Sequence, residues 1–208
     1  MKPSLAARAE PGDRTRSGGG RPRGPKRKID AEAWFETALE LMAVGGIDSV
    51  RVETLALKLG VTKGTFYVRF ETRDQFVELL LDHWRRISTL VVIAELSAID
   101  EPPLDRLVRV FSISTTERAK VRARIEASFR LWAYYDERPA RVLREIDQHR
   151  LMYFESVVVA NGVPKSEAEA RAFLIYAFLI SDAMLPGDRA SIRDICRAFL
   201  AMGTKWPA

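Results

Sequence analysis

The chain has 208 residues, 47% of them hydrophobic, which is enough to bury a core in one or two domains. One cysteine, Cys196, excludes an internal disulfide and a cysteine-based zinc site, and with only two histidines we expect neither a metal nor a cofactor. The longest apolar run, residues 172–180, is about half of what a membrane-spanning helix needs, and no signal peptide is recognisable. We therefore expect a soluble, cytoplasmic protein without a membrane partner.

The positive charge is concentrated at the N-terminus. Of the 33 Lys and Arg residues, nine lie within residues 1–28, together with only two of the 28 acidic residues. A basic segment rich in Gly, Pro and Ser cannot bury enough apolar surface to fold. Residues 1–27 are therefore predicted to be a disordered basic arm that seeks polyanions, the alternative being a simple solvated tail.

Helical periodicity dominates from Asp30 onward and predicts an all-α fold with about nine helices. The first helix starts after a cap at Asp30 and stops at Gly45-Gly46. A shorter helix covers about residues 52–59 and ends at Gly60, which suits a left-handed C-terminal cap. Thr62 is predicted to cap a brief third helix that reaches about residue 69.

A long amphipathic helix follows and closes near Asp100. Thr72 and Gln75 form a capping box at its start. Breaks in the remaining sequence predict five further helices, at about residues 104–113, 119–135, 138–161, 166–183 and 188–203.

The stretch VETLALKLGVTKGTFYVRF, residues 52–70, has the spacing of a helix-turn-helix. Ala56 is small enough to let two helices cross closely, and Gly60 turns the chain between them. Val61 and Phe66 would fill the angle between the two helices. The sequence therefore predicts a helix-turn-helix at about residues 51–70.

With WFETALELMAVGG before it and ETRDQF after it, this stretch resembles the DNA-binding domain of TetR-type transcriptional regulators. The run GVTKGTFY is the most characteristic part, and the resemblance extends over about residues 28–203. It implies an N-terminal three-helix DNA-binding domain, residues 28–88, that contains the helix-turn-helix. A C-terminal helical domain for effector binding and dimerisation, residues 89–208, would follow.

The resemblance also implies roles for single residues. Thr62 would touch a phosphate, Lys63 and Thr65 would reach base edges or phosphates, and Tyr67 would bond to the DNA backbone. Arg73 stands where the family usually has a lysine that grips phosphate, and its guanidinium keeps the charge.

Three further positions depart from the family pattern. Arg51 replaces the threonine that commonly opens the second helix, although its guanidinium can reach a phosphate. Val68 and Arg69 stand where His or Tyr is often found, so a base preference cannot be carried over. The predicted DNA-binding residues are Arg51, Thr62, Lys63, Gly64, Thr65, Tyr67, Arg69, Arg73, Arg21 and Arg23.

Gly64 and the arm carry two open alternatives. Gly64 falls in the first turn of the third helix, where a missing side chain lets the backbone approach DNA, or where it is merely a harmless glycine. Arg21 and Arg23 lie in GGRPRGPKRK, which resembles a loosened AT-hook. They would enter the minor groove, or the arm would act only as a non-specific electrostatic tether.

The two last predicted helices supply a dimer surface. Residues 172–180 are apolar around the whole helix, which implies burial on two sides, and the final helix has one apolar stripe. Paired across a twofold axis, they would form the four-helix interface typical of TetR-like proteins. A well-covered core helix in a monomer is the alternative. The predicted interface residues are Phe173, Tyr176, Ile180, Ile192, Ile195 and Phe199.

The resemblance further implies a cavity for an unknown small-molecule effector. Its aromatic lining is predicted from Trp84, Phe111, Phe129, Trp132, Tyr153 and Tyr176, with His83 and His149 as polar contacts. Ordinary core packing is the alternative for each of these residues.

The function expected from this pattern is that of a homodimeric repressor, released from a palindromic operator on double-stranded DNA by the effector. A DNA-binding regulator controlled by a protein partner or by its own concentration is the alternative. No nucleotide-binding loop, zinc-protease motif or nucleophile elbow is present, so the sequence predicts no enzyme.

Overall fold

The computed structural model describes residues 29–113, 116–185, 194–196 and 198, and within them the regular structure is entirely helical. The predicted all-α fold is therefore confirmed. The last predicted helix, residues 188–203, lies almost wholly outside the described residues. The α-helices are α1 Ala31–Gly45, α2 Val52–Lys58, α3 Lys63–Arg69, α4 Arg73–Arg85, α5 Val91–Ala98, α6 Pro103–Ile113, α7 Glu117–Trp132, α8 Glu137–Ala160 and α9 Lys165–Met184.

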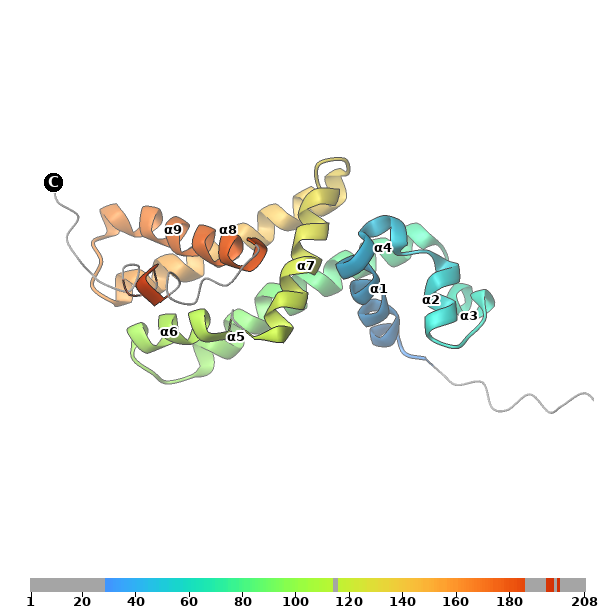
Figure 1. The fold of residues 1–208 in the computed structure, drawn as a ribbon, viewed down its shortest axis with the longest axis horizontal. Helices are drawn as coiled ribbons and strands as arrows, with labels where there is room; N and C mark the ends of the chain where they lie inside the picture. Colours follow the sequence, from blue (N-terminus) through green and yellow to red (C-terminus); the bar gives the residue numbers. More distant parts are fainter. Residues whose placement is uncertain (1–28, 114–115, 186–193, 197, 199–208) are drawn as a thin grey trace, which may run out of the picture.

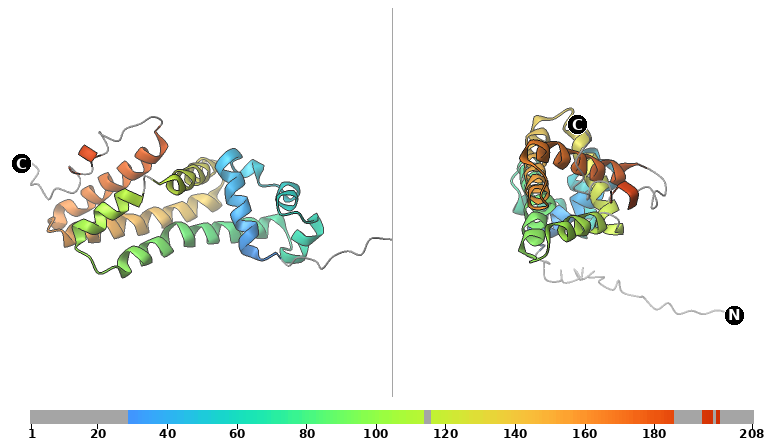
Figure 2. Two further views of the ribbon diagram at one scale, coloured as in Figure 1. Left: turned by 60° about the horizontal axis from the view of Figure 1, so that its bottom comes forward. Right: turned by 90° about the vertical axis from the view of Figure 1, so that its left-hand side faces the viewer.

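The molecule is elongated, with α1, α2 and α3 at one end and α6 and α9 at the other (Figure 1). A short 3-10 turn, η1 (Ile47–Ser49), precedes α2, and one π-helical turn, η2 (Arg86–Leu90), joins α4 to α5. The predicted single long helix is thus present, but it passes through a π turn that its sequence pattern did not indicate. This composite helix runs along the length of the molecule (Figure 2), so it connects the two ends.

Two helix starts follow the predicted capping chemistry. The carboxylate of Asp30 accepts a hydrogen bond from the backbone N–H of Ala33 at 2.9 Å. The hydroxyl of Thr72 accepts one from the N–H of Gln75 at 3.0 Å, while the side chain of Gln75 accepts from the N–H of Glu71 at 2.8 Å. These bonds satisfy donors that a helix N-terminus leaves without partners.

The turn between α2 and α3 depends on Gly60, whose φ of 67° lies in the left-handed region. The N–H of Val61 donates to the carbonyl of Ala56 at 2.9 Å, and that of Gly60 to the carbonyl of Leu57 at 3.1 Å. This pair of bonds is the Schellman motif, in which glycine avoids the strain that a Cβ would cause.

The start of α3 differs from the expectation. Thr62 occupies the N-cap position with an extended backbone, but its side chain makes no capping hydrogen bond. Its hydroxyl lies instead 3.3 Å from the hydroxyl of Thr65. The predicted side-chain cap is therefore wrong, because the two hydroxyl groups pair with each other.

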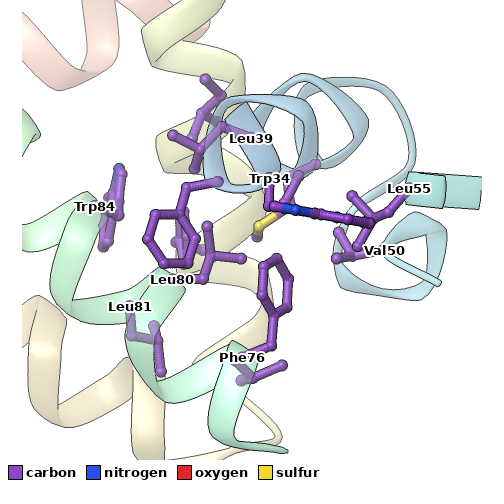
Figure 3. Packing of buried hydrophobic residues seen from close by; sticks show 14 of the residues in the cluster. Trp34, Leu39, Val50, Leu55, Phe76, Leu80, Leu81 and Trp84 are labelled. Carbon is purple, nitrogen blue, oxygen red and sulfur yellow. The ribbon is translucent and has the colours of Figure 1, made fainter. Parts of the chain in front are cut away.

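The first part of the core joins α1 to α4, α7 and α8. In Figure 3 the fully buried Trp34 lies between Leu55 and Phe76. Further along α4, the indole of Trp84 stacks on the ring of Phe129 from α7, with centroids 3.8 Å apart and planes 12° from parallel. The same cluster includes Ile146 of α8, so the hydrophobic core extends across the domain boundary expected at residue 88.

The second part of the core lies at the other end of the molecule. It joins α5, α6, α8 and α9 through one shared group of buried side chains, which includes Leu96, Leu107, Phe111, Phe154, Val157 and Ile175. The two clusters together hold the whole length of the composite helix against the rest of the chain.

The stacked pair at the junction gives a stability prediction. Phe129→Ala should lower the free energy of unfolding by about 3–5 kcal/mol, because it removes a fully buried ring that stacks on Trp84. Chemical denaturation followed by circular dichroism measures this change. Leu131→Ala, two residues away and 60% exposed, should change it by less than about 0.5 kcal/mol. Equal effects of the two variants would contradict this account of the junction.

Candidate DNA-binding surface and ligand cavity

A buried aromatic group fixes the orientation of α3. Phe66 has no exposed surface, and its ring packs edge-on against Trp34 with centroids 5.4 Å apart. It also contacts Phe70 and Phe76, at 5.1 and 5.3 Å. Because this one face of α3 is held against α1 and α4, the opposite face has to point into solvent.

The outward face of α3 carries most of the predicted DNA contacts. Lys63, Tyr67 and Arg69 are exposed, and Val68 is 89% exposed. Thr65 is half-buried beside them. Val68 is thus an exposed apolar residue that lies between Lys63 and Arg69 in the sequence of this short helix. Such a surface suits contact with DNA bases and with the DNA backbone, since direct readout uses both polar and apolar contacts.

Lys63 is not free on this face. Its ammonium group forms an ion pair with the carboxylate of Glu53, one helix earlier. The hydrogen bond from Lys63 holds the pKa of Glu53 below its usual value. Both side chains are exposed, so the ion pair is weak. To contact a phosphate, the Lys63 ammonium group has to break this ion pair or bind the phosphate and Glu53 at the same time.

Two further arginines border α2. The Nε of Arg51 donates to the carbonyl of Asp48 at 3.0 Å, and Nη2 of Arg73 lies 3.5 Å from the carbonyl of Val50. Both guanidinium groups therefore also brace the turn before α2. Arg21 and Arg23 lie outside the described residues.

Gly64 is exposed in the first turn of α3, with an ordinary helical backbone. A Cβ atom added there would meet only the hydroxyl oxygen of Thr62, at 3.6 Å, which is normal van der Waals contact. Folding therefore does not require glycine at this position.

A cavity of about 210 Å³ lies between η2, α5, α6, α7, α8 and α9. Tyr153 and Tyr176, both predicted as lining residues, are at its wall. Its apolar lining comes mainly from Val92, Ile93, Leu96, Val110, Phe154, Leu179, Ile180 and Met184, and its polar lining from Ser88, Thr89, Arg122, Glu126 and Arg150.

The other predicted lining residues lie elsewhere. Trp84, Phe129 and Trp132 belong to the first core cluster, because their helix faces are turned toward α1 and the start of α8. Phe111 is buried in the second cluster, with its ring against Phe178. None of these four contacts the cavity, so the prediction that they line it is corrected to core packing.

The two histidines are also outside the cavity. His83 is buried between α1 and α4, stacked on Phe35 with centroids 5.0 Å apart. Burial lowers its pKa, although the nearby carboxylate of Glu32, 3.6 Å away, opposes this effect. His149 is exposed, and its Nδ1 contacts the carbonyl oxygen of Glu145 at 2.7 Å.

A network of paired charges closes one side of the cavity. Nη1 of Arg150 bonds to the carboxylate of Glu126 at 2.9 Å and to the hydroxyl of Tyr176 at 3.0 Å. Nη2 of Arg130 bonds to Glu126 at 2.8 Å and to Asp147 at 2.7 Å. Two arginines thus neutralise two carboxylates, which is the condition under which charges are tolerated inside a protein.

The protonation of this network follows from its pairing. Burial opposes the charge of Arg150, but the Glu126 carboxylate and the Tyr176 hydroxyl raise its pKa above the usual value. Burial raises the pKa of Tyr176 as well. Its hydroxyl therefore stays protonated and donates to Asp147 at 2.5 Å.

Arg150 also reaches the composite helix. Its Nη2 donates to the carbonyl of Ser88, inside the π turn, at 3.1 Å. The sequence contained a signal for this role, because Arg150 interrupts the stripe of buried residues on α8 between Ile146 and Tyr153. A charged residue in such a stripe indicates a buried ion pair or a binding site.

The exposed face of α9 carries part of the predicted dimer surface. Phe173 is 60% exposed with Leu174 beside it, and Ile195 is exposed too. Tyr176 is buried and Ile180 half-buried, and both line the cavity, so these two predicted interface residues pack within the chain itself. Ile192 and Phe199 lie outside the described residues.

Two negative findings concern the described part of the chain. No helix in it is both long and apolar enough to cross a membrane. Among the same residues, no group of three or more His, Cys, Asp or Glu side chains is placed to bind a metal.

Comparisons with known proteins address the family directly. Residues 35–80 match the family model described as bacterial regulatory proteins, tetR family. An uncharacterized HTH-type transcriptional regulator of Bacillus subtilis (strain 168) is 28% identical over 115 residues, which are 55% of this chain. The match spans 46% of that relative, so the chain covers about half the length of the protein that it resembles.

Solved structures show the same fold. A transcriptional regulator from Rhodococcus sp. Rha1 superposes with a TM-score of 0.66 at 20% identity, over 84% of this chain and 94% of that one. A regulator from Saccharomonospora viridis, solved in complex with choline, gives 0.63 at 19% identity, over 82% and 92%. Residues 35–80 therefore match the DNA-binding region of the tetR family, and the chain as a whole has the all-helical fold of these solved regulators.

Proposed function

We propose that this protein is a homodimeric repressor that binds a palindromic operator through α3 and leaves it when a small molecule occupies the cavity. The observation that carries the proposal is the outward face of α3, which the buried ring of Phe66 fixes. Lys63, Tyr67, Val68 and Arg69 project from it, within the region that matches the tetR family. Phosphate contacts position such a helix while a few side chains meet base edges.

Dimerisation is supported by the exposed apolar side chains on α9. Phe173 and Leu174 stand side by side there, and large apolar residues gathered on a surface helix favour an interface. A recognition helix of only seven residues covers few base pairs. Two copies related by a twofold axis would read two half-sites about 34–36 Å apart, or a multiple of that distance.

Effector control is supported by the cavity beside the composite helix. If the protein were a regulator without a small-molecule ligand, we would expect side chains to fill the interior of the C-terminal helices. Instead, a cavity of about 210 Å³ is open there. The fold neighbour from Saccharomonospora viridis was solved with choline, so the architecture can hold a small molecule. The composite helix would have two arrangements, one that favours DNA binding and one that does not. A ligand that binds the second arrangement more tightly would lower the affinity for DNA, because α4 belongs to this helix.

Selection of bound sequences from a random DNA pool with the purified full chain tests the DNA-binding part of the proposal. We expect a palindrome, because two identical recognition helices read the two strands symmetrically. Random recovery would refute sequence-specific regulation.

A doubly substituted variant tests dimerisation through α9 without changing the recognition helix α3. Phe173→Asp with Leu174→Asp changes two exposed residues of α9 and leaves α3 untouched. It should be monomeric in analytical ultracentrifugation and should bind the selected palindrome at least tenfold more weakly. A dimeric variant with unchanged affinity would show that α9 is not the interface.

The ion pair between α2 and α3 gives a prediction about affinity. Glu53→Gln removes the charge that holds Lys63 and opposes phosphate, so operator affinity should rise about two- to fivefold, a small effect because the ion pair is exposed. The slope of log affinity against log salt should steepen by about one charge, since Lys63 then releases a counterion on binding. Fluorescence anisotropy over a salt series measures both quantities.

A matched control exists in the same domain. Glu40 forms an exposed ion pair with Lys58 at 3.5 Å, between α1 and α2 and away from α3. Glu40→Gln makes the same change of charge without releasing a residue of α3. If it raised affinity and salt dependence as much as Glu53→Gln, the effect would come from net charge and not from Lys63.

Gly64 gives a steric prediction. Gly64→Val should leave the melting temperature nearly unchanged, because a Cβ meets only ordinary contacts there, but should weaken operator binding at least tenfold by keeping the backbone from the groove. Gly64→Ala should have a smaller effect of the same sign. Equal affinities of the glycine, alanine and valine proteins would show that the glycine is incidental.

A further inference from the structure

Three of the groups around the cavity have polar atoms without a partner. Ser88 Oγ, Thr89 Oγ1 and the hydroxyl of Tyr153 are buried and make no hydrogen bond within the part of the chain that the structure describes. Thr89 is 1% exposed and Tyr153 is 9% exposed, and all three residues line the cavity. Buried polar atoms in native proteins are nearly always bonded, so a cluster of unpaired hydroxyl groups at a cavity wall indicates a ligand.

Two of these unpaired hydroxyl groups lie in the π turn, η2. Serine and threonine within an α-helix often bond back to the carbonyl four residues earlier. Neither Ser88 nor Thr89 does so in η2, and the carbonyl of Ser88 is taken by Arg150 at 3.1 Å. Isolated π turns are frequent at functional sites because they redirect side chains from the regular helix.

The charges around the cavity favour an anion. Glu126 is the one acidic lining residue in the described part of the chain, and Arg130 and Arg150 both bind it. Arg122 lies one turn earlier on the same face of α7, at the cavity, and the salt bridges found among the described residues do not include it. The balance of the site is therefore one positive charge.

A cationic ligand has little to meet in this site. Both carboxylates of the network, Glu126 and Asp147, are neutralised by arginines. The ring of Tyr176 already faces the guanidinium of Arg150, with the carbon of that group 5.7 Å from the ring centroid. A second cation would be repelled by Arg122, which is exposed beside the cavity and takes part in none of the salt bridges found among the described residues.

We propose that the cavity binds an amphipathic carboxylate. Its carboxylate group is held by Arg122 and by the hydroxyl groups of Ser88 and Thr89, and its hydrocarbon part lies against Val92, Leu96 and Ile180. Charge-assisted bonds from a guanidinium and hydroxyl groups satisfy such an anion, and the apolar lining accounts for the rest of the molecule. This inference rests on the proposed function only in taking the cavity as the effector site.

The position of the site explains how ligand binding would affect the DNA-binding end of the molecule. Ser88 and Thr89 belong to the same composite helix that carries α4, and Trp84 lies one turn before them against Phe129. A ligand bonded to the π turn acts directly on the element that enters the DNA-binding domain.

Isothermal titration calorimetry on the full chain, without DNA, tests the ligand class. The probes are octanoate, octan-1-ol and octyltrimethylammonium, which share a hydrocarbon chain and differ in the charge of the polar group. We expect octanoate to bind at least tenfold more tightly than octan-1-ol and the cation not to bind. Preference for the alcohol or the cation, or no binding of octanoate, would overturn the proposal.

Variants identify the groups that hold the carboxylate. Arg122→Gln should weaken octanoate binding about tenfold and leave octan-1-ol unchanged, whereas loss of structure would weaken both. Arg124→Gln is the matched control, because Arg124 is exposed on the same helix and does not line the cavity. Equal losses in the two arginine variants would refute the role of Arg122.

Thr89→Val separates ligand binding from stability. It removes a buried hydroxyl that has no partner, so the melting temperature should stay the same or rise while octanoate affinity falls at least threefold. A lower melting temperature with unchanged affinity would show that the hydroxyl is structural.

The outcomes are independent of DNA binding. Failure of octanoate to bind, with a palindrome recovered from the DNA pool, would refute only the ligand class. Octanoate binding with random DNA recovery would leave the ligand site in place and refute the regulator.

Discussion

The composite helix from Arg73 to Ala98 is the constraint on which the other features of this structure depend. Its first turns pack against α1 through Phe76 and Leu80, its middle stacks on α7 through Trp84, and its second half forms a wall of the cavity. Since one composite helix is closely packed in both parts of the core, we expect a shift of this helix at the cavity to displace α4 as well. The position of α4 and the shape of the cavity are therefore linked by one element.

The charged network is the second constraint, and it acts on the same helix. Arg150 joins Glu126 of α7 and Tyr176 of α9 to the carbonyl of Ser88 in the π turn. A buried arginine is stable only while its partners remain in place, so this contact favours one arrangement of three helices around the turn. Among the described residues of α1, α2 and α3, no comparable buried network is found. There, Phe66 and its aromatic neighbours fix α3, and the polar residues on its outer face remain in solvent.

Helix caps and turns could be predicted well from the sequence, whereas contacts between residues on different helices could not. The caps at Asp30 and Thr72 and the glycine turn at Gly60 involve groups within a few residues of each other, so their spacing suffices. The cap expected from Thr62 failed, because a neighbouring hydroxyl competed for it. The ion pair of Lys63 with Glu53 joins two helices whose crossing angle the sequence does not specify.

By itself, the sequence determined the helical class, the position of the helix-turn-helix and the resemblance of this region to TetR-type regulators. Periodicity, caps and glycines act over short distances and are visible in the order of residues. Only the tertiary structure decided which apolar faces become core and which line a cavity. Trp84 and Phe129 stack in the first core cluster, whereas Tyr153 and Tyr176 belong to the second cluster and also line the cavity, although all four are aromatic residues on amphipathic helices. The difference depends on how distant helices pack around the π turn, and no local pattern encodes that.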